Sequence, residues 1–298
     1  TDRSLVQLLW VKQNEPDVFA KIYKVLVCCM DYVTLKLTGK AITEMDLGRA
    51  TAMLNPERTD WAQELLDIAG IPRAILPELK QRAELIGEVR EEIAAECGLA
   101  PGTKIAMGTG DTACTGIGAG LLKPGDAYMN GGTSAGVVVM GHDKKPIQRL
   151  TASSGSSMSW LKNTILLHEQ DEAKRTGRDI FDIINEEIQK APIGSNGVLF
   201  HPYLAGERAP RQNPRAKGSF VGISLTTTRQ DIIRSVVEGI GFNLNVIMQS
   251  FRNEGYTITR LPIVGGLGNG QMTKQIFADI MNVELVTYAY INEAAAVG

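Results

Sequence analysis

The chain has 298 residues, of which 44% are hydrophobic and 21% are charged, and its formal net charge is -2. This composition predicts an ordinary globular protein with about two domains and excludes a disordered chain. So small a net charge gives no electrostatic basis for binding nucleic acid or an anionic membrane, and the apolar stretches are too short to span a bilayer. The four cysteines contain no CxxC pair, which favours a reducing, cytoplasmic compartment.

The first third of the chain, to about Leu99, has apolar residues at helical spacing. A glycine follows two of these segments, Gly70 and Gly98, where each helix should end. The pattern therefore predicts a helical opening to the chain, in which the adjacent Cys28 and Cys29 are buried packing residues. The patterned segments are residues 5–12, 18–26, 61–68 and 88–97.

From Lys104 onward, short apolar strands alternate with helices, which predicts an α/β fold. The longest predicted helix, 229–252, has one apolar stripe and begins with Thr228 and Asp231 at capping-box spacing. We place the domain boundary between residues 124 and 125. The predicted strands are 104–107, 127–130, 135–140, 198–204, 263–264 and 283–288; the other predicted helices are 112–121, 272–281 and the segment that begins at Glu293.

Three glycine-rich turns lie in the second part of this pattern, at residues 108–111, 131–134 and 265–270. A strand, a glycine turn and a helix together present backbone N–H groups and the positive end of a helix dipole to an anion. Glycine also lets the backbone approach phosphate oxygens without a Cβ in the way. One such turn is weak evidence, whereas three predict a site that binds phosphate groups.

The first of these turns allows more than one interpretation. Residues 108–113 fit the loose GxGxxA dinucleotide pattern, which would indicate a nicotinamide or flavin enzyme. However, the next strand ends at Asn130 instead of an acidic residue, and Asp111 would repel a bound pyrophosphate. A carboxylate at the start of a helix also suits a general base that accepts a hydroxyl proton. It can equally serve only as the helix cap.

The residues around these turns resemble the FGGY carbohydrate kinases, which phosphorylate sugars and polyols with ATP. The resemblance covers nearly the whole chain. Its most similar branch is the xylulose kinases, which implies a ketopentose as the substrate, with glycerol and gluconate as alternatives. A catalytically silent nucleotide-binding relative is a further alternative. The segments that carry the resemblance are LLWVKQNEP (8–16), GTGD (108–111), GTS (132–134), PYLAGERAP (202–210), GSFVGI (218–223), residues 231–238 and residues 265–269.

The resemblance implies an actin-like (ribonuclease H-like) ATPase fold of two domains with a nucleotide cleft between them. Residues 1–124 would be the C-terminal part of the sugar-binding domain, and residues 125–298 the ATP-binding domain. Asp111 would be the general base and touch the sugar, with Glu207 as a second substrate-binding residue. Mg²⁺ would bridge phosphate oxygens without a direct protein ligand. The ATP-binding residues would be Gly132, Thr133, Ser134, Gly155, Gly265, Gly266 and Asn269.

The sequence also departs from the family pattern. The strand hairpin with which the family opens is missing. Residues 46–49 resemble the phosphate motif of that hairpin only in part, so we interpret the resemblance of this segment as accidental. The closing helices are missing as well. We therefore expect a fragment that is not an active kinase alone. The expected partner is a small sugar or polyol, with no nucleic acid and no membrane, and a homodimer is consistent with the family.

Overall fold

The computed structural model describes residues 4–289 and 293–298 and contains two compact units, Thr1–Asp111 and Thr112–Gly298. The division falls earlier in the chain than the boundary that we placed between residues 124 and 125. The reason is that α7 (Asp111–Gly118) packs within the second unit. A Cβ added to Gly118 would lie 2.0 Å from the carbonyl oxygen of Ala294, which shows how closely this helix contacts the end of the chain.

The first unit combines short helices with two small sheets. Strands β1 and β2 pair in parallel, and β3 and β4 pair antiparallel. The prediction of a wholly helical segment to Leu99 is therefore wrong, and residues 85–88 form a strand that ends at the first residue of the predicted helix 88–97. The elements are α1 (Ser4–Asn14), α2 (Pro16–Phe19), α3 (Cys29–Thr38), β1 (Ile42–Glu44), α4 (Met45–Ala50), α5 (Gln63–Ala69), β2 (Glu78–Lys80), β3 (Leu85–Glu88), α6 (Glu91–Cys97) and β4 (Lys104–Ala106).

The segment that follows α2 is not helical, although its apolar residues have helical spacing. Contacts with residues far along the chain hold it in an irregular conformation instead. The N–H of Val25 donates to the carbonyl of Ile75 at 2.7 Å. The ammonium of Lys24 donates to the carbonyls of Ala74 and Leu76 on the same segment. These hydrogen bonds replace the local ones that a helix over residues 20–26 would have made.

The two adjacent cysteines lie at the start of α3, not within a buried helical stripe. Cys29 is exposed and Cys28 is half-buried, so the prediction that both are packing residues is wrong. Cys28 precedes the first residue of the helix and donates its thiol to Asp31 at 3.5 Å, and burial raises the pKa of that thiol. The segment Asp46–Arg49 lies inside α4, where it forms no turn around a phosphate group.

A five-stranded sheet with the order β11-β10-β5-β6-β7 forms the centre of the second unit. Strand β6 pairs antiparallel with both β5 and β7, whereas β10 pairs in parallel with β5 and with β11. The hairpin predicted at Asn130–Gly131 is confirmed, because Gly131 pairs with Ala135 across it. The strands are β5 (Ala127–Gly131), β6 (Ala135–Met140), β7 (Pro146–Leu150), β10 (Arg260–Val264) and β11 (Glu284–Val286).

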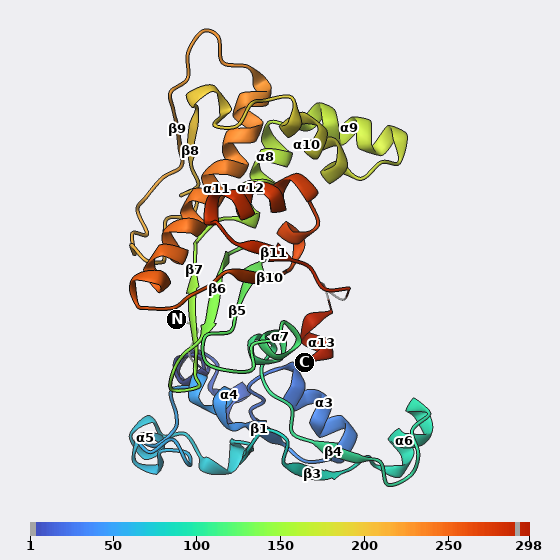
Figure 1. Cartoon of the computed structure of the whole chain (residues 1–298). Helices are drawn as coiled ribbons and strands as arrows, with labels where there is room; N and C mark the ends of the chain where they lie inside the picture. Colours follow the sequence, from blue (N-terminus) through green and yellow to red (C-terminus); the bar gives the residue numbers. More distant parts are fainter. Residues whose placement is uncertain (1–3, 290–292) are drawn as a thin grey trace. The chain divides into compact units, whose positions relative to one another are not determined.

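Helices cover both faces of this sheet (Figure 1). Val137 and Val139 of β6 belong to the large core under α11 and α12, whereas Val138 between them packs with Ala119 and Ala294 on the other face. The predicted α/β fold is thus confirmed. Within residues 4–289 and 293–298, no helix is long and apolar enough to cross a membrane. The remaining elements are α8 (Gly155–Thr164), α9 (Leu167–Thr176), α10 (Ile180–Gln189), β8 (Leu199–His201), β9 (Ser219–Val221), α11 (Arg229–Asn253), α12 (Gln271–Met281) and α13 (Ala294–Val297).

The capping box predicted for the long helix is present at the start of α11. The hydroxyl of Thr228 accepts the N–H of Asp231 at 3.2 Å, and the carboxylate of Asp231 accepts the N–H of Thr228 at 2.8 Å. The side-chain amide of Asn196 donates to the same carboxylate at 2.9 Å. The backbone hydrogen bond from Thr228 is the main cause that lowers the pKa of Asp231.

We expect Asp231→Asn to reduce the acid sensitivity of the second unit. A carboxyl whose pKa is lowered by folding stabilises the protein above its ordinary pKa of 3.8, and this stabilisation is lost as the pH falls through the lower, folded value. Urea denaturation between pH 7 and pH 3 should therefore show a smaller loss of unfolding free energy in the variant. Thr228→Ala is the control, since it costs about 1 kcal/mol at pH 7 and keeps the carboxylate. An unchanged acid dependence in Asp231→Asn would contradict the assignment.

Candidate functional site

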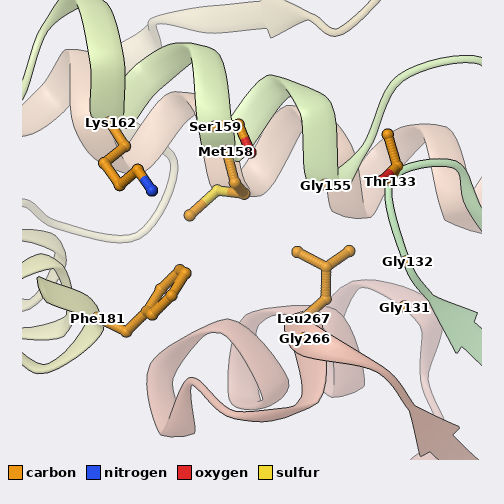
Figure 2. A pocket seen from close by; sticks show the side chains of 10 residues that line it. All are labelled: Gly131, Gly132, Thr133, Gly155, Met158, Ser159, Lys162, Phe181, Gly266 and Leu267. Atoms are coloured by element: carbon orange, nitrogen blue, oxygen red, sulfur yellow. The ribbon is translucent and has the colours of Figure 1, made fainter. Parts of the chain in front are cut away.

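A cavity of about 320 Å³ lies in the second unit, where two of the glycine turns meet the start of α8 (Figure 2). Its volume is in the range of small-molecule binding sites. Four of the residues predicted to bind ATP line it, which brings together segments that are more than a hundred residues apart in the chain. The lining residues are Gly131, Gly132, Thr133, Gly155, Met158, Ser159, Lys162, Phe181, Gly266 and Leu267.

The β5–β6 hairpin is fastened directly to the N-terminus of α8. The N–H groups of Ser154 and Ser156 both donate to the carbonyl of Thr133 at 3.2 Å. Gly155, the first residue of α8, lies so close to the hairpin that an added Cβ would be 2.5 Å from the carbonyl oxygen of Gly132. Only glycine fits at position 155 without moving backbone atoms, so this contact explains the residue type that the sequence shows there.

Asn130 orders the tip of the hairpin, a role that the sequence analysis did not assign to it. The N–H of Gly132 donates to the side-chain oxygen of Asn130 at 3.1 Å. This backbone amide therefore already has a hydrogen-bond partner in the structure. Gly132 contributes mainly by lacking a side chain, whereas Thr133 next to it is exposed at the cavity.

The third glycine turn packs against the hairpin from β10. Gly265 has a φ of 93°, and an added Cβ would lie 3.0 Å from the carbonyl carbon of Gly131, so both its conformation and its contact require glycine. Gly266 lines the cavity and has open space where a Cβ would stand. Asn269 is exposed and ends the short helix Gly266–Gly268, outside the set of described residues that line the cavity.

Ser134, like Gly265 and Asn269, is a predicted ATP-binding residue outside the lining set of the described chain. Its hydroxyl donates to the carbonyl of Ala152 at 3.4 Å, which ties the hairpin to the loop before α8. Ser134 and Gly265 thus support the shape of the cavity, while Gly132, Thr133, Gly155 and Gly266 form its surface. The binding roles of all these residues stay predictions.

The charges at the cavity suit an anionic ligand. Helix α8 has ten residues, and its N-terminus, the positive end of its dipole, opens at Gly155. Lys162 is the one charged side chain among the described lining residues, and no carboxylate is present in that set. A positive helix end and side-chain-free backbone are features with which proteins bind phosphate groups, and the lysine adds a positive charge to the same cavity.

The cavity does not offer the ligands of a protein-bound metal ion. Mg²⁺ prefers oxygen ligands such as carboxylates, and the lining set contains none. Among residues 4–289 and 293–298, no group of three or more His, Cys, Asp and Glu side chains is arranged to hold a metal ion. Any Mg²⁺ at this cavity would have to be bound through phosphate oxygens and water, which stays a prediction.

The turn that carries Asp111 belongs to the first unit. Asp111 is exposed and is the first residue of α7. The glycines before it pack closely, since a Cβ on Gly108 would lie 2.8 Å from the sulfur of Met30. The strand before the turn, β4, pairs antiparallel with β3 in a two-stranded sheet. Because a dinucleotide fingerprint opens a parallel βαβ unit, the dinucleotide interpretation of residues 108–113 does not fit.

Glu207 is buried, and hydrogen bonds within the second unit occupy its carboxylate. One oxygen accepts the N–H groups of Ala152 at 3.1 Å and Arg208 at 2.6 Å, and the other accepts the side-chain amide of Asn243. Glu207 thus ties the loop 202–210 to α11 and to the loop before α8. Its predicted contact with a substrate stays a prediction.

We expect Glu207→Ala to lower the free energy of unfolding of the second unit by about 2 kcal/mol, because the buried amide of Asn243 and the half-buried N–H of Ala152 lose their acceptor. Urea denaturation followed by circular dichroism measures the change. Glu254→Ala is the matched control, since it removes an ion pair with Arg149 at a carboxylate that is 48% exposed, and it should change stability by less than about 1 kcal/mol. Equal effects of the two substitutions would contradict the ordering role.

Comparisons with protein families give matches along the whole chain. Residues 1–118 match the model of the N-terminal domain of the FGGY family of carbohydrate kinases, and residues 105–298 match the model of its C-terminal domain. The two matches overlap at α7, the helix at which the compact units divide.

Individual relatives agree with these matches. The chain is 30% identical to a xylulose kinase of Bacillus subtilis over 95% of its own length and 58% of the relative. Among solved structures, it is similar to a xylulose kinase of Lactobacillus acidophilus, with 27% identity and a TM-score of 0.78, and to a gluconate kinase of the same organism, with 27% identity and a TM-score of 0.79. The two structural alignments cover 99% of this chain and 61% of each solved chain, so this chain spans less than two thirds of the length of these proteins.

Proposed function

Because the chain belongs to the FGGY family of carbohydrate kinases, we propose that the protein transfers the terminal phosphoryl group of ATP to a hydroxyl group of a sugar or polyol. The observation that carries this proposal is the cavity at which Gly132, Thr133, Gly155 and Gly266 meet the N-terminus of α8. Such an arrangement can hold a nucleotide by its phosphates, as phosphoryl transfer requires.

In the proposed mechanism, the carboxylate of Asp111 accepts the proton of the substrate hydroxyl. As this proton leaves, the hydroxyl oxygen forms a bond to the γ-phosphorus, and the bond between that phosphorus and the bridging oxygen breaks, which releases ADP. The backbone at Gly132 and Gly266 and the dipole of α8 would hold the phosphates in position. Bound Mg²⁺ would supply further neutralisation of the phosphate charge. Asp111 is exposed, so it is accessible to a substrate.

The proposed acceptor is a ketopentose such as xylulose. Relatives named xylulose kinase support it, and relatives named gluconokinase or gluconate kinase make gluconate the principal alternative. Acceptors of similar size differ by a few hydrogen bonds within the site, so relatives at about this level of identity leave the choice between them open.

A coupled assay of ADP release tests the proposal, with the protein expressed from its complete gene and supplied with pentuloses, hexuloses, gluconate and glycerol. We expect the highest kcat/KM with a ketopentose. A highest value with gluconate or glycerol would change the substrate and keep the reaction. ADP that binds while no acceptor is phosphorylated would contradict the proposal and favour a catalytically silent nucleotide-binding protein.

A further inference from the structure

The cavity has two ends that differ in chemistry. Glycine backbone forms the end at the N-terminus of α8, whereas side chains form the other end. Met158, Ser159 and Lys162 follow Gly155 on α8 at spacings that place all four residues on one face of the helix. Figure 2 shows Lys162 and Phe181 facing each other across this end, with Phe181 contributed by α10. The cavity therefore runs along α8 from its N-terminus toward Lys162.

This direction fixes which part of a nucleotide would reach Lys162. The phosphates belong at the helix N-terminus, because the positive end of the helix dipole and the side-chain-free backbone of Gly132, Gly155 and Gly266 lie there. Lys162 stands two turns further along α8, roughly 10 Å along the axis. That distance places the nucleobase, and not the phosphates, beside Lys162. The ring of Phe181, which is 37% exposed, provides a surface on which a base can stack.

Donors outnumber acceptors among the side chains at this end of the cavity. Lys162 is half-buried, and its ammonium makes no hydrogen bond or ion pair with any residue in the described part of the chain. A lysine has three donors and no acceptor. Its neighbours in the cavity are the apolar or weakly polar side chains of Met158, Phe181 and Leu267, and the hydroxyl of Ser159.

Purine bases respond differently to such a donor. Guanine and hypoxanthine present two adjacent acceptors, O6 and N7, whereas adenine presents N7 beside the amino group N6, which is a donor. A site that selects adenine needs an acceptor for N6. The lining side chains contain no carboxylate or amide, and the hydroxyl of Ser159, which can accept, can equally donate. An unpaired ammonium instead matches the O6 and N7 edge.

We infer that the ammonium of Lys162 donates hydrogen bonds to the base of the bound nucleotide. The site would then bind guanine and hypoxanthine nucleotides about as well as adenine nucleotides. This inference rests on the proposed function, because it takes the cavity to be the nucleotide site. It assigns to the protein a choice of phosphoryl donors that extends to GTP and ITP.

Titration calorimetry with ADP, GDP and IDP tests the inference without depending on turnover. We expect the dissociation constants of GDP and IDP to lie within about ten-fold of that of ADP. Lys162→Met keeps the length of the side chain and removes the donors. This substitution should weaken the binding of GDP and IDP by about ten-fold or more, and the binding of ADP by less than about three-fold. Lys174→Met, at an exposed position of α9, is the matched control and should change none of the three values.

The outcomes separate this inference from the function on which it rests. If ADP binds tightly while GDP and IDP bind more than about ten-fold more weakly, the inference is overturned and the proposed function stays intact. A Lys162→Met protein with an unchanged ratio of GDP to ADP affinity would overturn the role of Lys162. Failure of all three nucleotides to bind would overturn the nucleotide site itself, and the proposed function with it.

Discussion

Asp111→Asn is expected to lower the turnover of sugar phosphorylation by about 10²- to 10⁴-fold, while the affinity for ADP stays unchanged. The substitution keeps the shape of the side chain and removes the group that accepts the hydroxyl proton. Asp111 lies outside the set of residues that line the cavity proposed to bind the nucleotide, so the loss should appear in kcat and not in nucleotide binding. The coupled ADP assay measures kcat, and calorimetry measures the dissociation constant of ADP.

The matched control is Glu96→Gln, which changes an exposed carboxylate of α6 in the same unit. It should leave kcat within about two-fold of the unsubstituted protein, as is usual for surface substitutions away from a site. A correctly folded Asp111→Asn or Asp111→Ala protein that turns over sugar at the normal rate would refute the role of Asp111 as the base. Loss of both activity and ADP binding would instead indicate that the substitution disturbs α7.

Elements whose signals are local could be predicted from the sequence. The capping residues Thr228 and Asp231 and an apolar stripe of period 3.6 are local signals that predict α11. The β5–β6 hairpin follows from Asn130–Gly131 between two apolar runs. The boundaries of both elements agree with the prediction to within one residue at each end because their caps and turns are themselves encoded locally.

The small sheets of the first unit carried no such signal. Strands β1 and β2 have three residues each and pair across the intervening α4 and α5, so their stability comes from tertiary contacts. The irregular segment after α2 is a case of the same kind, since its apolar spacing is helical and its hydrogen bonds go to Ala74, Ile75 and Leu76. Spacing alone could not reveal partners fifty residues away.

The residues of the candidate site also differ in whether the sequence alone could predict them. Glycine turns are visible in the sequence, and they led to Gly132, Gly155 and Gly266, which line the cavity at its proposed phosphate end. Lys162 and Phe181 were not predicted, because their roles exist only once α8 and α10 have packed together. The spacing of Gly155, Ser159 and Lys162 was the available signal, but it becomes meaningful only when residues 155–164 are recognised as a helix.

Gly155→Ala is expected to weaken ADP binding by about 10- to 100-fold, because small displacements of binding groups have effects of this size. The new Cβ would stand 2.5 Å from the carbonyl oxygen of Gly132 and 3.2 Å from the Cα of Thr133, and both are backbone atoms that cannot rotate away. The hairpin and the N-terminus of α8 must therefore separate, which moves the two groups that would hold the phosphates. Calorimetry with ADP measures the loss.

Thermal unfolding of the same variant distinguishes this displacement from an ordinary change in helix stability. Alanine stabilises a helix by about 1 kcal/mol relative to glycine, so a Gly155→Ala protein without a steric conflict would melt at a higher temperature. We expect a lower melting temperature instead, because the conflict outweighs the gain. Thr164→Ala, at the exposed far end of α8, is the control and should leave ADP binding unchanged. A Gly155→Ala protein with a raised melting temperature and normal ADP affinity would show that the hairpin does not need this contact, and the phosphate end of the cavity would then have to be sought elsewhere.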